Sequence, residues 1–423
     1  MNEVGINKIT RRDFLQKGLV FGAGAAGLAA GYAAVPDVFA RAVYGAKRDG
    51  VMNDRVLVMI QLAGGADGLQ TVIPLQDSRL RTLRPRLSAA ADQALPMNAQ
   101  LGLNRNLRGI KALWDQGKVA VVNGVGYPRP SFSHFDSIRV WETGDPTRRQ
   151  VEGWLGKTIA KNYDSQGHPL VGCACGTTSV PGALRDLEAT LTVVNGQSSF
   201  RFSSADAERA MGAIYNGTPG IYGALFDTAV YTARDTVARL RTAREAYVPK
   251  AQYSDNARLV YSSRNQLGAA LQLAAELIIS GAGAKILHVT LGGWDTHDQQ
   301  LARHDSLMAY LDQAVTAFHA DLGAYGMADR VLVATWSEFG RRPQETANGG
   351  TDHGTASSML LVGDTVKGGV YGQMPSLTAL DRTGNLAYTV DFRSVYQEIL
   401  ASHLKVDARE VLDQSFERTP FIA

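Results

Sequence analysis

The fold is decided by residues 56–65, which read VLVMIQLAGG. A short, nearly continuous apolar run that ends in a glycine pair is typical of a β-strand buried on both faces. Similar runs follow at residues 119–122, 286–291, 331–334 and 359–362. The sequence therefore predicts that these five segments are buried strands.

Helical segments separate these strands. Apolar residues recur at three- and four-residue intervals over residues 307–322, and a second apolar stripe covers residues 267–277. Strand, helix and strand in this order favour an α/β fold with a mainly parallel sheet sandwiched by helices. Residues 177–253 depart from the pattern, with a polar β-prone segment and a charged helix over residues 233–248. We expect a helical/β insertion or a lid there.

Length, charge and cysteine content narrow the class of protein. The chain has 423 residues, a formal net charge of +3 and two cysteines. So small a charge, with no basic face interleaved with aromatic residues, argues against a nucleic-acid partner. The two cysteines, Cys173 and Cys175, are separated by one residue, which excludes a disulfide scaffold. We expect a single large α/β domain over residues 41–423.

The first forty residues are interpreted as an export signal. TRRDFL at residues 10–15 precedes a Gly/Ala-rich apolar run over residues 18–34, and VFA at residues 38–40 suits cleavage by a signal peptidase. The pattern resembles a twin-arginine signal, which implies export of the folded protein by the twin-arginine machinery. We expect a periplasmic or secreted protein whose mature form has no stable membrane span.

The segments that follow the predicted strands carry polar residues, and ligands of parallel α/β sheets bind beyond the carboxyl ends of the strands. The first strand is followed by GGADG at residues 64–68. Asp67 in this turn is either a site carboxylate or a turn residue that accepts hydrogen bonds from backbone amides.

The second strand is followed by SFSHFD at residues 131–136. Ser131 or Ser133 is either a nucleophile at a helix start or an ordinary helix N-cap. His134 is of a type that can bind a metal or a leaving group, although a lone histidine is more often structural.

The third strand is followed by GGWDTH at residues 292–297, which places Asp295 and His297 on one side of an extended backbone. A carboxylate with an imidazole is a common ligand pair for zinc, manganese or iron. The alternative role for Asp295 is a helix N-cap.

The fourth strand is followed by Glu338 and Arg341, and then by Asp352 and His353 in a glycine-rich loop. The Asp-His pair has no apolar periodicity around it, which favours contact with a metal or substrate. Arg341 could hold an anionic group, or be a plain surface charge.

These motifs together resemble the exported bacterial family of unknown function numbered 1501. The resemblance rests on GGADG at 64–68, SHF at 133–135, GGWDTH at 292–297, SEFGR at 337–341, TDHG at 351–354 and DFRSVY at 391–396. That family in turn resembles, distantly, the alkaline phosphatase and sulfatase superfamily in the order of its site residues. The match departs from the superfamily in having one residue between Asp295 and His297, where three are usual. The Asp-His dipeptide also comes later after its strand, so Glu338 could take the place of the dipeptide and His353 that of the late histidine.

The resemblance implies an alkaline-phosphatase-like fold and a metal-dependent hydrolase of phosphate or sulfate esters. The implied metal ligands are Asp67, Asp295, His297, Asp352 and His353. In this interpretation Ser133 attacks the ester, Glu338 binds metal or carries a proton, and Arg341 holds the anion. Two divalent ions, of zinc, manganese, magnesium or calcium, are expected because paired metals suit phosphoryl transfer. The substrate would be a small molecule or a glycan ester. The alternative is a non-catalytic exported binding protein on the same fold.

Overall fold

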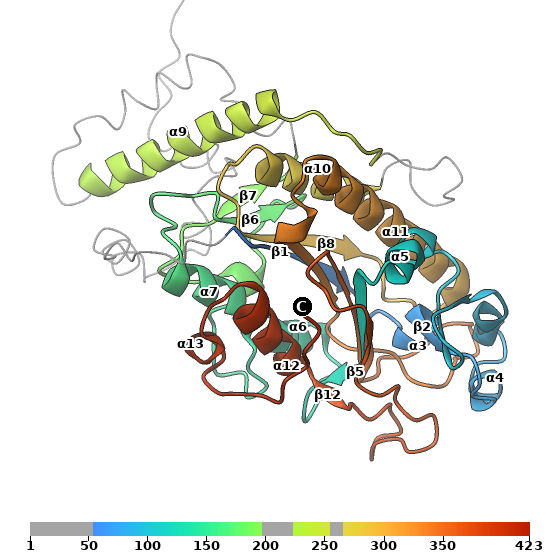
Figure 1. The fold of residues 1–423 in the computed structure, drawn as a ribbon. Coiled ribbons are helices and arrows are strands. Elements are labelled where there is room, and N and C mark those ends of the chain that lie inside the picture. Colours follow the sequence, from blue (N-terminus) through green and yellow to red (C-terminus); the bar gives the residue numbers. More distant parts are fainter. Residues whose placement is uncertain (1–53, 197–222, 254–264) are drawn as a thin grey trace, which may run out of the picture.

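A mixed, mostly parallel sheet forms the centre of the molecule (Figure 1). The computed structural model describes residues 54–196, 223–253 and 265–423, and the signal expected at residues 1–40 lies outside them. In this described part, nine strands form the main sheet, in the order β11-β5-β10-β9-β1-β8-β6-β7 with β12 beside β5. Only β10 among them runs antiparallel to its neighbours β5 and β9. The predicted fold class is confirmed.

The strands have the following bounds. The main sheet contains β1 Val56–Ala63, β5 Val119–Gly126, β6 Gly172–Cys175, β7 Thr192–Val194, β8 Ile286–Gly292, β9 Val331–Trp336, β10 Ser357–Val362, β11 Gly369–Tyr371 and β12 Val390–Asp391. A small antiparallel sheet contains β2 Val72–Pro74, β3 Leu95–Pro96 and β4 Leu101–Leu103. All five strands predicted from apolar runs are confirmed, as β1, β5, β8, β9 and β10.

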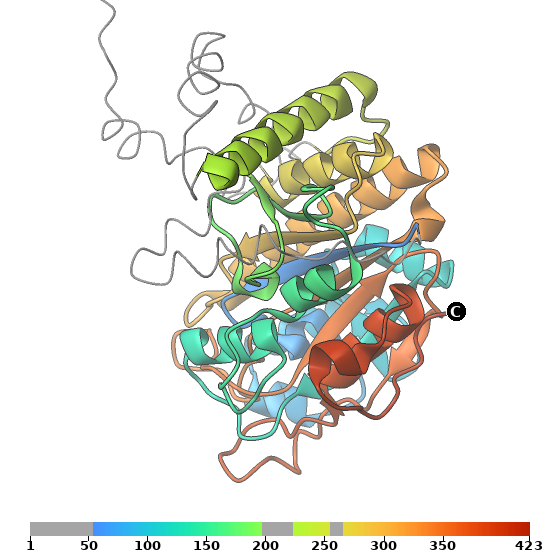
Figure 2. The ribbon, with the colours of Figure 1, turned by 90° about the vertical axis from the view of Figure 1, so that its left-hand side faces the viewer.

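Helices cover both faces of the main sheet (Figure 2). They are α3 Gly68–Thr71, α4 Arg79–Leu83, α5 Arg108–Asp115, α6 His134–Thr143, α7 Trp154–Asn162, α9 Gly223–Ala246, α10 Gln266–Ile279, α11 Gln300–Ala324, α12 Phe392–Glu398 and α13 Ala408–Leu412. The helices predicted at residues 267–277 and 307–322 are confirmed as parts of α10 and α11. None of the helices in the described ranges is both long enough and apolar enough to cross a lipid bilayer.

Successive side chains of β1 pack into two different cores, one on each face of the sheet. Val58 and Ile60 pack into one core with residues of α5, α10 and α11. Leu57 and Met59 point to the other face and pack into a second core with residues of α6, α7, α12 and α13. Because successive side chains of a strand point to opposite faces, a strand buried on both sides is apolar at every position.

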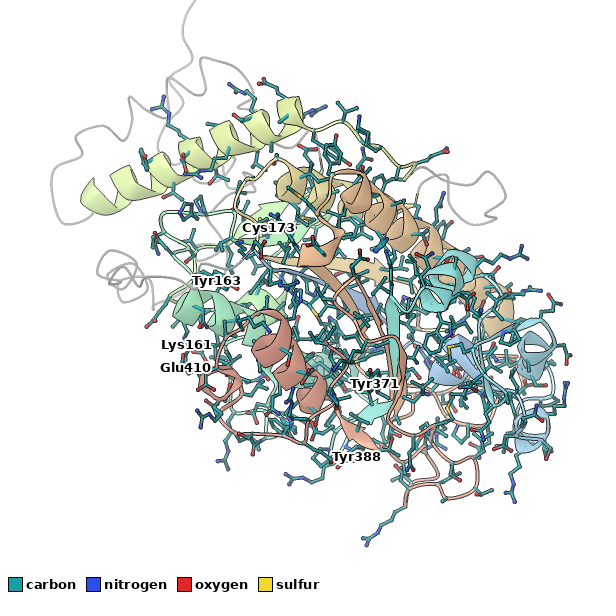
Figure 3. The ribbon with its side chains drawn as sticks, viewed as in Figure 1. Lys161, Tyr163, Cys173, Tyr371, Tyr388 and Glu410 are labelled. Atoms are coloured by element: carbon teal, nitrogen blue, oxygen red, sulfur yellow. The ribbon has the colours of Figure 1, made fainter. Side chains whose placement is uncertain are left out.

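Contacts between neighbouring helices stabilise the layer on each face of the sheet. On the second face, Lys161 of α7 donates a hydrogen bond to the backbone carbonyl of Glu410 in α13, and the two residues lie side by side in Figure 3. On the first face, α9 packs against α10 on the side away from the sheet (Figures 1 and 2). The charged helix predicted over residues 233–248 is therefore confirmed as the later part of α9.

The region expected to be an insertion is divided between two layers. Its β-prone start contributes β7, an edge strand that pairs in parallel with β6 of the main sheet. Its helix α9 lies outside α10, and residues 197–222 between them lie outside the described part of the chain. A role for residues 177–253 as a lid stays a prediction.

Candidate metal centre

The parallel strands β1, β5, β8 and β9 bring four loops to one edge of the sheet. His134 begins α6 after β5, and Asp295 and His297 follow β8. His353 lies in the loop between β9 and β10, and an isolated antiparallel bridge holds it opposite Arg341. Residues far apart in the sequence therefore meet beyond the carboxyl ends of the strands, as the sequence predicts.

Three histidines surround the carboxylate of Asp295. His353 Nε2 lies 3.1 Å and His297 Nε2 lies 2.9 Å from Asp295 Oδ1, and His134 Nε2 lies 3.5 Å from Asp295 Oδ2. The Nε2 atoms of His297 and His353 are 3.0 Å apart. His134, Asp295 and His353 offer ligand atoms that all lie within 4.8 Å of one another, a spacing that could hold a metal ion. We call these three residues, together with His297 beside Asp295, the metal-binding cluster, a candidate site named for this geometry.

The partners of the outer ring nitrogens identify which nitrogen of each histidine carries the proton. His353 Nδ1 is 2.8 Å from the carbonyl oxygen of Phe132, and His134 Nδ1 is 2.8 Å from Glu338 Oε1. Both partners can only accept, so Nδ1 is the donor in each ring. In the neutral rings the Nε2 lone pairs of His134 and His353 therefore face the oxygens of Asp295, acceptor against acceptor.

A divalent cation bound between the histidine nitrogens and Asp295 would remove the repulsion between these facing acceptors. Burial lowers the pKa of His353, which favours its neutral form at neutral pH. Two histidine nitrogens whose lone pairs converge on a carboxylate suit a metal of the zinc, manganese or iron class. Each outer nitrogen also has the acceptor partner that metal-bound histidines commonly have. The donor set therefore fits a metal ion.

Asp295 is held in its ionised form by a buried arginine. Burial by itself would raise the pKa of Asp295, but the hydrogen bond and the positive charge of Arg341 outweigh it and lower the pKa to about 2. Arg341 Nη2 donates to Asp295 Oδ1 across 2.8 Å. The side chain of Asp295 stays 46% exposed, so the carboxylate is reachable from solvent.

Glu338 is fully buried behind His134. Its Oε1 accepts hydrogen bonds from the amide of Gly64, at 2.9 Å, and from His134 Nδ1. Glu338 therefore lies behind the imidazole of His134, and its predicted role as a metal ligand or proton carrier stays a prediction. The ring of Phe339 packs beside His134 and His353, with centroids 4.9 and 4.5 Å away.

Asp67 is hydrogen-bonded to residues outside the cluster. Its Oδ1 accepts from the amides of Leu69 and Gln70, so it caps α3, and its Oδ2 accepts from Arg84 at 2.7 Å and Gln300 at 2.6 Å. Burial would raise the pKa of Asp67, but the charge of Arg84 and these hydrogen bonds outweigh it and lower the pKa. The turn-residue alternative describes its contacts better than the metal-ligand one.

Arg341 is also buried and hydrogen-bonded within the protein. The side chain has no exposed surface, and its guanidinium donates to the carbonyls of Gly64, Gly65, Trp294 and Thr351 and to Asp295. Because the guanidinium is buried, a substrate anion in solvent does not reach it. The anion-holding role expected for Arg341 is therefore not supported by its contacts, which instead join three of the loops.

Asp352 and the two serines lie at the rim. The Asp352 side chain is 62% exposed, and its Oδ1 lies 3.5 Å from His297 Nδ1. Ser131 Oγ accepts from the amide of Ser133 and donates to Asp136. Ser133 precedes α6, and its hydroxyl makes no capping hydrogen bond to the helix.

His134 is the functional candidate that the expected ligand set left out. The sequence signal was its position beside Ser133, directly after a predicted strand end. To choose His134 as a candidate ligand, one must know that it contacts Glu338, which is 204 positions away in the chain. Local sequence carries no information about that contact.

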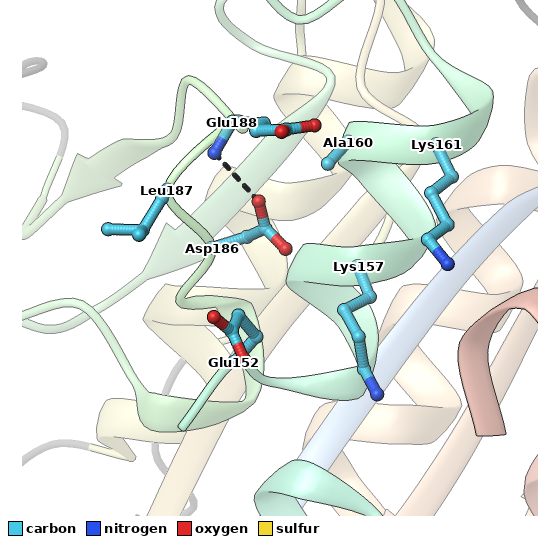
Figure 4. Close-up of a pocket in the computed structure, with 7 residues that line it drawn as sticks. All are labelled: Glu152, Lys157, Ala160, Lys161, Asp186, Leu187 and Glu188. Atoms are coloured by element: carbon cyan, nitrogen blue, oxygen red, sulfur yellow. Dashed lines mark hydrogen bonds between the residues drawn. The ribbon is translucent and has the colours of Figure 1, made fainter. Parts of the chain in front are cut away.

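A separate pocket lies between α7 and the segment before β7 (Figure 4). Its charged lining consists of Lys157 and Lys161 of α7 with Glu152, Asp186 and Glu188. Asp186 accepts a hydrogen bond from the Glu188 amide at 2.7 Å, and burial raises the pKa of Asp186. The pocket contains no residue of the metal-binding cluster.

The chain is similar to one protein family and to several solved structures. Residues 120–416 match the family described as protein of unknown function DUF1501. Among solved structures, the chain is similar to the C-terminal periplasmic domain of EcEptC from Escherichia coli in complex with Zn, with 11% identity, a TM-score of 0.35 and 75% of each chain covered. It is also similar to the PsFucS1 sulfatase from Pseudoalteromonas sp., with 11% identity, a TM-score of 0.35, and 79% of this chain and 68% of that chain covered.

A third similar structure is the alkaline phosphatase from the Antarctic bacterium TAB5, with 9% identity, a TM-score of 0.33, and 73% of this chain and 91% of that chain covered. No curated protein sequence matches the chain. The family match spans more than half of the chain, so this chain belongs to the DUF1501 family.

Proposed function

We propose that this member of the DUF1501 family is an exported, metal-dependent hydrolase of phosphate or sulfate esters. The observation that carries the proposal is the metal-binding cluster, in which the Nε2 lone pairs of His134 and His353 face the carboxylate of Asp295. A half-exposed carboxylate keeps this cluster open to a substrate from solvent. The resemblance of the site-residue order to the alkaline phosphatase and sulfatase superfamily supplies the ester class.

In this proposal His134, Asp295, His297 and His353 hold the metal. When bound, a divalent metal supplies Lewis-acid stabilisation of negative charge on ester oxygens. Glu338 and the Phe132 carbonyl orient His134 and His353, and Arg341 orients Asp295. These groups fix the ligands in place before any substrate arrives.

Ser133 is the proposed nucleophile. It stands between Phe132, whose carbonyl contacts His353, and His134, so the backbone holds it beside the cluster. Ser131 is already engaged with Asp136, which favours Ser133 of the two. The first amides of α6 have no partner inside the helix and favour a negatively charged group at that position. Ser133 Oγ would attack phosphorus or sulfur, the ester alcohol would leave, and water would then release the acid from the serine.

The proposal includes export in folded form through the twin-arginine machinery. It rests on the resemblance of residues 10–40 to a twin-arginine signal. Replacing Arg11 and Arg12 together by lysine should retain the protein inside the cell, as measured by fractionation. Unchanged export of this double variant would contradict the route.

The second candidate is a non-catalytic exported protein that binds a metal or a ligand on this fold. The contacts of Asp67 favour it, because a residue expected to complete a two-metal site is bound to Arg84 instead. This candidate predicts metal without ester turnover.

The deciding experiment combines metal analysis with an ester screen of the exported protein, purified without chelators. We expect bound metal and hydrolysis of an aryl phosphate or aryl sulfate. Ser133→Ala should abolish turnover and keep the metal, whereas the matched control Ser131→Ala should keep both. Metal without turnover on any ester would favour the second candidate, and no metal at all would overturn both the mechanism and the cluster as a metal centre.

A further inference from the structure

A layer of buried polar side chains lies directly behind the metal-binding cluster. It consists of Asp67, Arg84, Gln300 and Arg341, each with at most 1% of its surface exposed. We call this set the buried polar layer.

Gln300 connects this layer to the loops that carry the cluster. Its Nε2 donates to Asp67 Oδ2, and its Oε1 accepts from the hydroxyls of Thr296, at 3.1 Å, and Thr351, at 2.5 Å. Thr296 lies between Asp295 and His297, and Thr351 precedes the Asp-His dipeptide. The buried polar layer and the cluster are therefore adjacent shells of one site.

The carboxylate of Asp67 has no capacity left for a metal. Each of its oxygens already accepts two hydrogen bonds, four in total, from two backbone amides, Arg84 and Gln300. A carboxylate offers about four lone-pair positions. The pair with Arg84, at 2.7 Å, also balances its charge.

Asp295 likewise has neighbours on two sides. On one side it faces the histidine nitrogens of the cluster, and on the other it accepts from the buried guanidinium of Arg341. A guanidinium keeps its charge at any pH a protein meets. Arg341 and Arg84 thus supply permanent positive charge to the two carboxylates that follow β1 and β8.

We infer that the site holds one metal ion rather than two, and that Arg341 and Arg84 occupy the electrostatic role of a second metal toward Asp295 and Asp67. This inference rests on the metal site of the proposed function and specifies its stoichiometry. One ion would be bound by the cluster, and the second expected position is filled by two arginines of the chain itself.

The test measures zinc binding by the chelator-treated exported protein, using calorimetric titration with Zn²⁺ alone and elemental analysis of the reloaded protein. We expect about one equivalent in the wild type. Asp67→Asn and Asp295→Asn form a matched pair, since each replaces one carboxylate oxygen by an amide. The first should keep one equivalent, and the second should lose the zinc while its melting temperature without metal stays close to that of the wild type.

Two equivalents in the wild type, or loss of metal in Asp67→Asn with the fold retained, would overturn the one-metal inference and leave the proposed hydrolase standing. No zinc in the wild type would overturn both. If Asp67→Asn does not fold, the wild-type stoichiometry still decides between one ion and two.

Discussion

Two loops of almost identical sequence have opposite roles. GGAD at residues 64–67 follows β1, and GGWD at residues 292–295 follows the neighbouring parallel strand β8. They pack so closely that a Cβ on Gly64, whose φ is +125°, would lie 2.4 Å from the amide nitrogen of Asp295. Yet the Asp67 side chain is 1% exposed and holds four hydrogen bonds, whereas Asp295 is 46% exposed and faces histidine lone pairs.

The difference shows that the donors aimed at a carboxylate, rather than its local motif, decide its function. Asp67 meets donors on both oxygens and becomes structural. Asp295 meets one arginine and three imidazoles, so part of its coordination is free for a cation. Variants that exchange or remove these partners therefore test the comparison directly.

The largest expected effect concerns the structural carboxylate. Arg84→Met leaves the fully buried Asp67 without its counter-ion, and breaking a buried pair in this way costs about 3–5 kcal/mol of unfolding free energy. Chemical denaturation measures this loss. Arg81→Met is the matched control, because Arg81 and its partner Asp92 are largely exposed and the change should be far smaller. Equal effects of the two variants would contradict a structural role for the Asp67 pair.

The same pair should make stability depend on acid pH. The folded-state pKa of Asp67 lies below its unfolded value, so its contribution is complete above the unfolded value of about 4 and is lost as pH falls through the folded pKa. The difference in unfolding free energy between wild type and Asp67→Asn should be constant near neutral pH and shrink below about pH 4. A difference that grows on acidification would reverse this assignment.

Next in size is the loss of a proposed ligand that the sequence did not select. His134→Ala should weaken Zn²⁺ binding by more than about 100-fold, since even changes to groups behind metal ligands weaken binding by about 10- to 100-fold. Calorimetric titration measures the affinity. The exposed His168 provides the control variant His168→Ala, which should bind as the wild type does. Unchanged affinity in His134→Ala would remove α6 from the site.

Glu338→Gln tests the orientation of that ligand from behind. The amide oxygen can still accept from His134 Nδ1, but the negative charge that strengthens this bond is lost. We expect Zn²⁺ affinity to fall by about 10-fold with little change in melting temperature. A loss as large as that of His134→Ala would instead indicate that Glu338 binds the metal directly.

The elements of the fold were predictable because their signals are local. Apolar runs and helical stripes marked β1, β8 and α11, and parallel pairing brought their loops to one edge. The roles of the site residues were not predictable in the same way. Asp67 receives its donors from Arg84 and Gln300, which are 17 and 233 positions away, so GGAD and GGWD cannot be told apart from sequence alone.

The small edge elements were missed for a related reason. β11 and β12 contain only three and two residues, and their pairing with β5 provides the order that their own sequence does not signal. The same applies to Arg341, whose five partners come from three loops. Its motif SEFGR is compatible with a surface cation, and only the packed loops show that it is buried.

The smallest expected effect separates two carboxylates that the sequence placed in one ligand set. Asp352 is more exposed than Asp295, at 62% against 46%, and its Oδ1 lies 3.5 Å from His297 Nδ1. An exposed charge at that distance contributes at most about 1 kcal/mol. Asp352→Asn should therefore change Zn²⁺ affinity by less than about fivefold, the equivalent of that energy. A 100-fold loss would show instead that Asp352 turns inward to bind the ion, so that accessibility, and not only a shortage of donors, marks a ligand in this site.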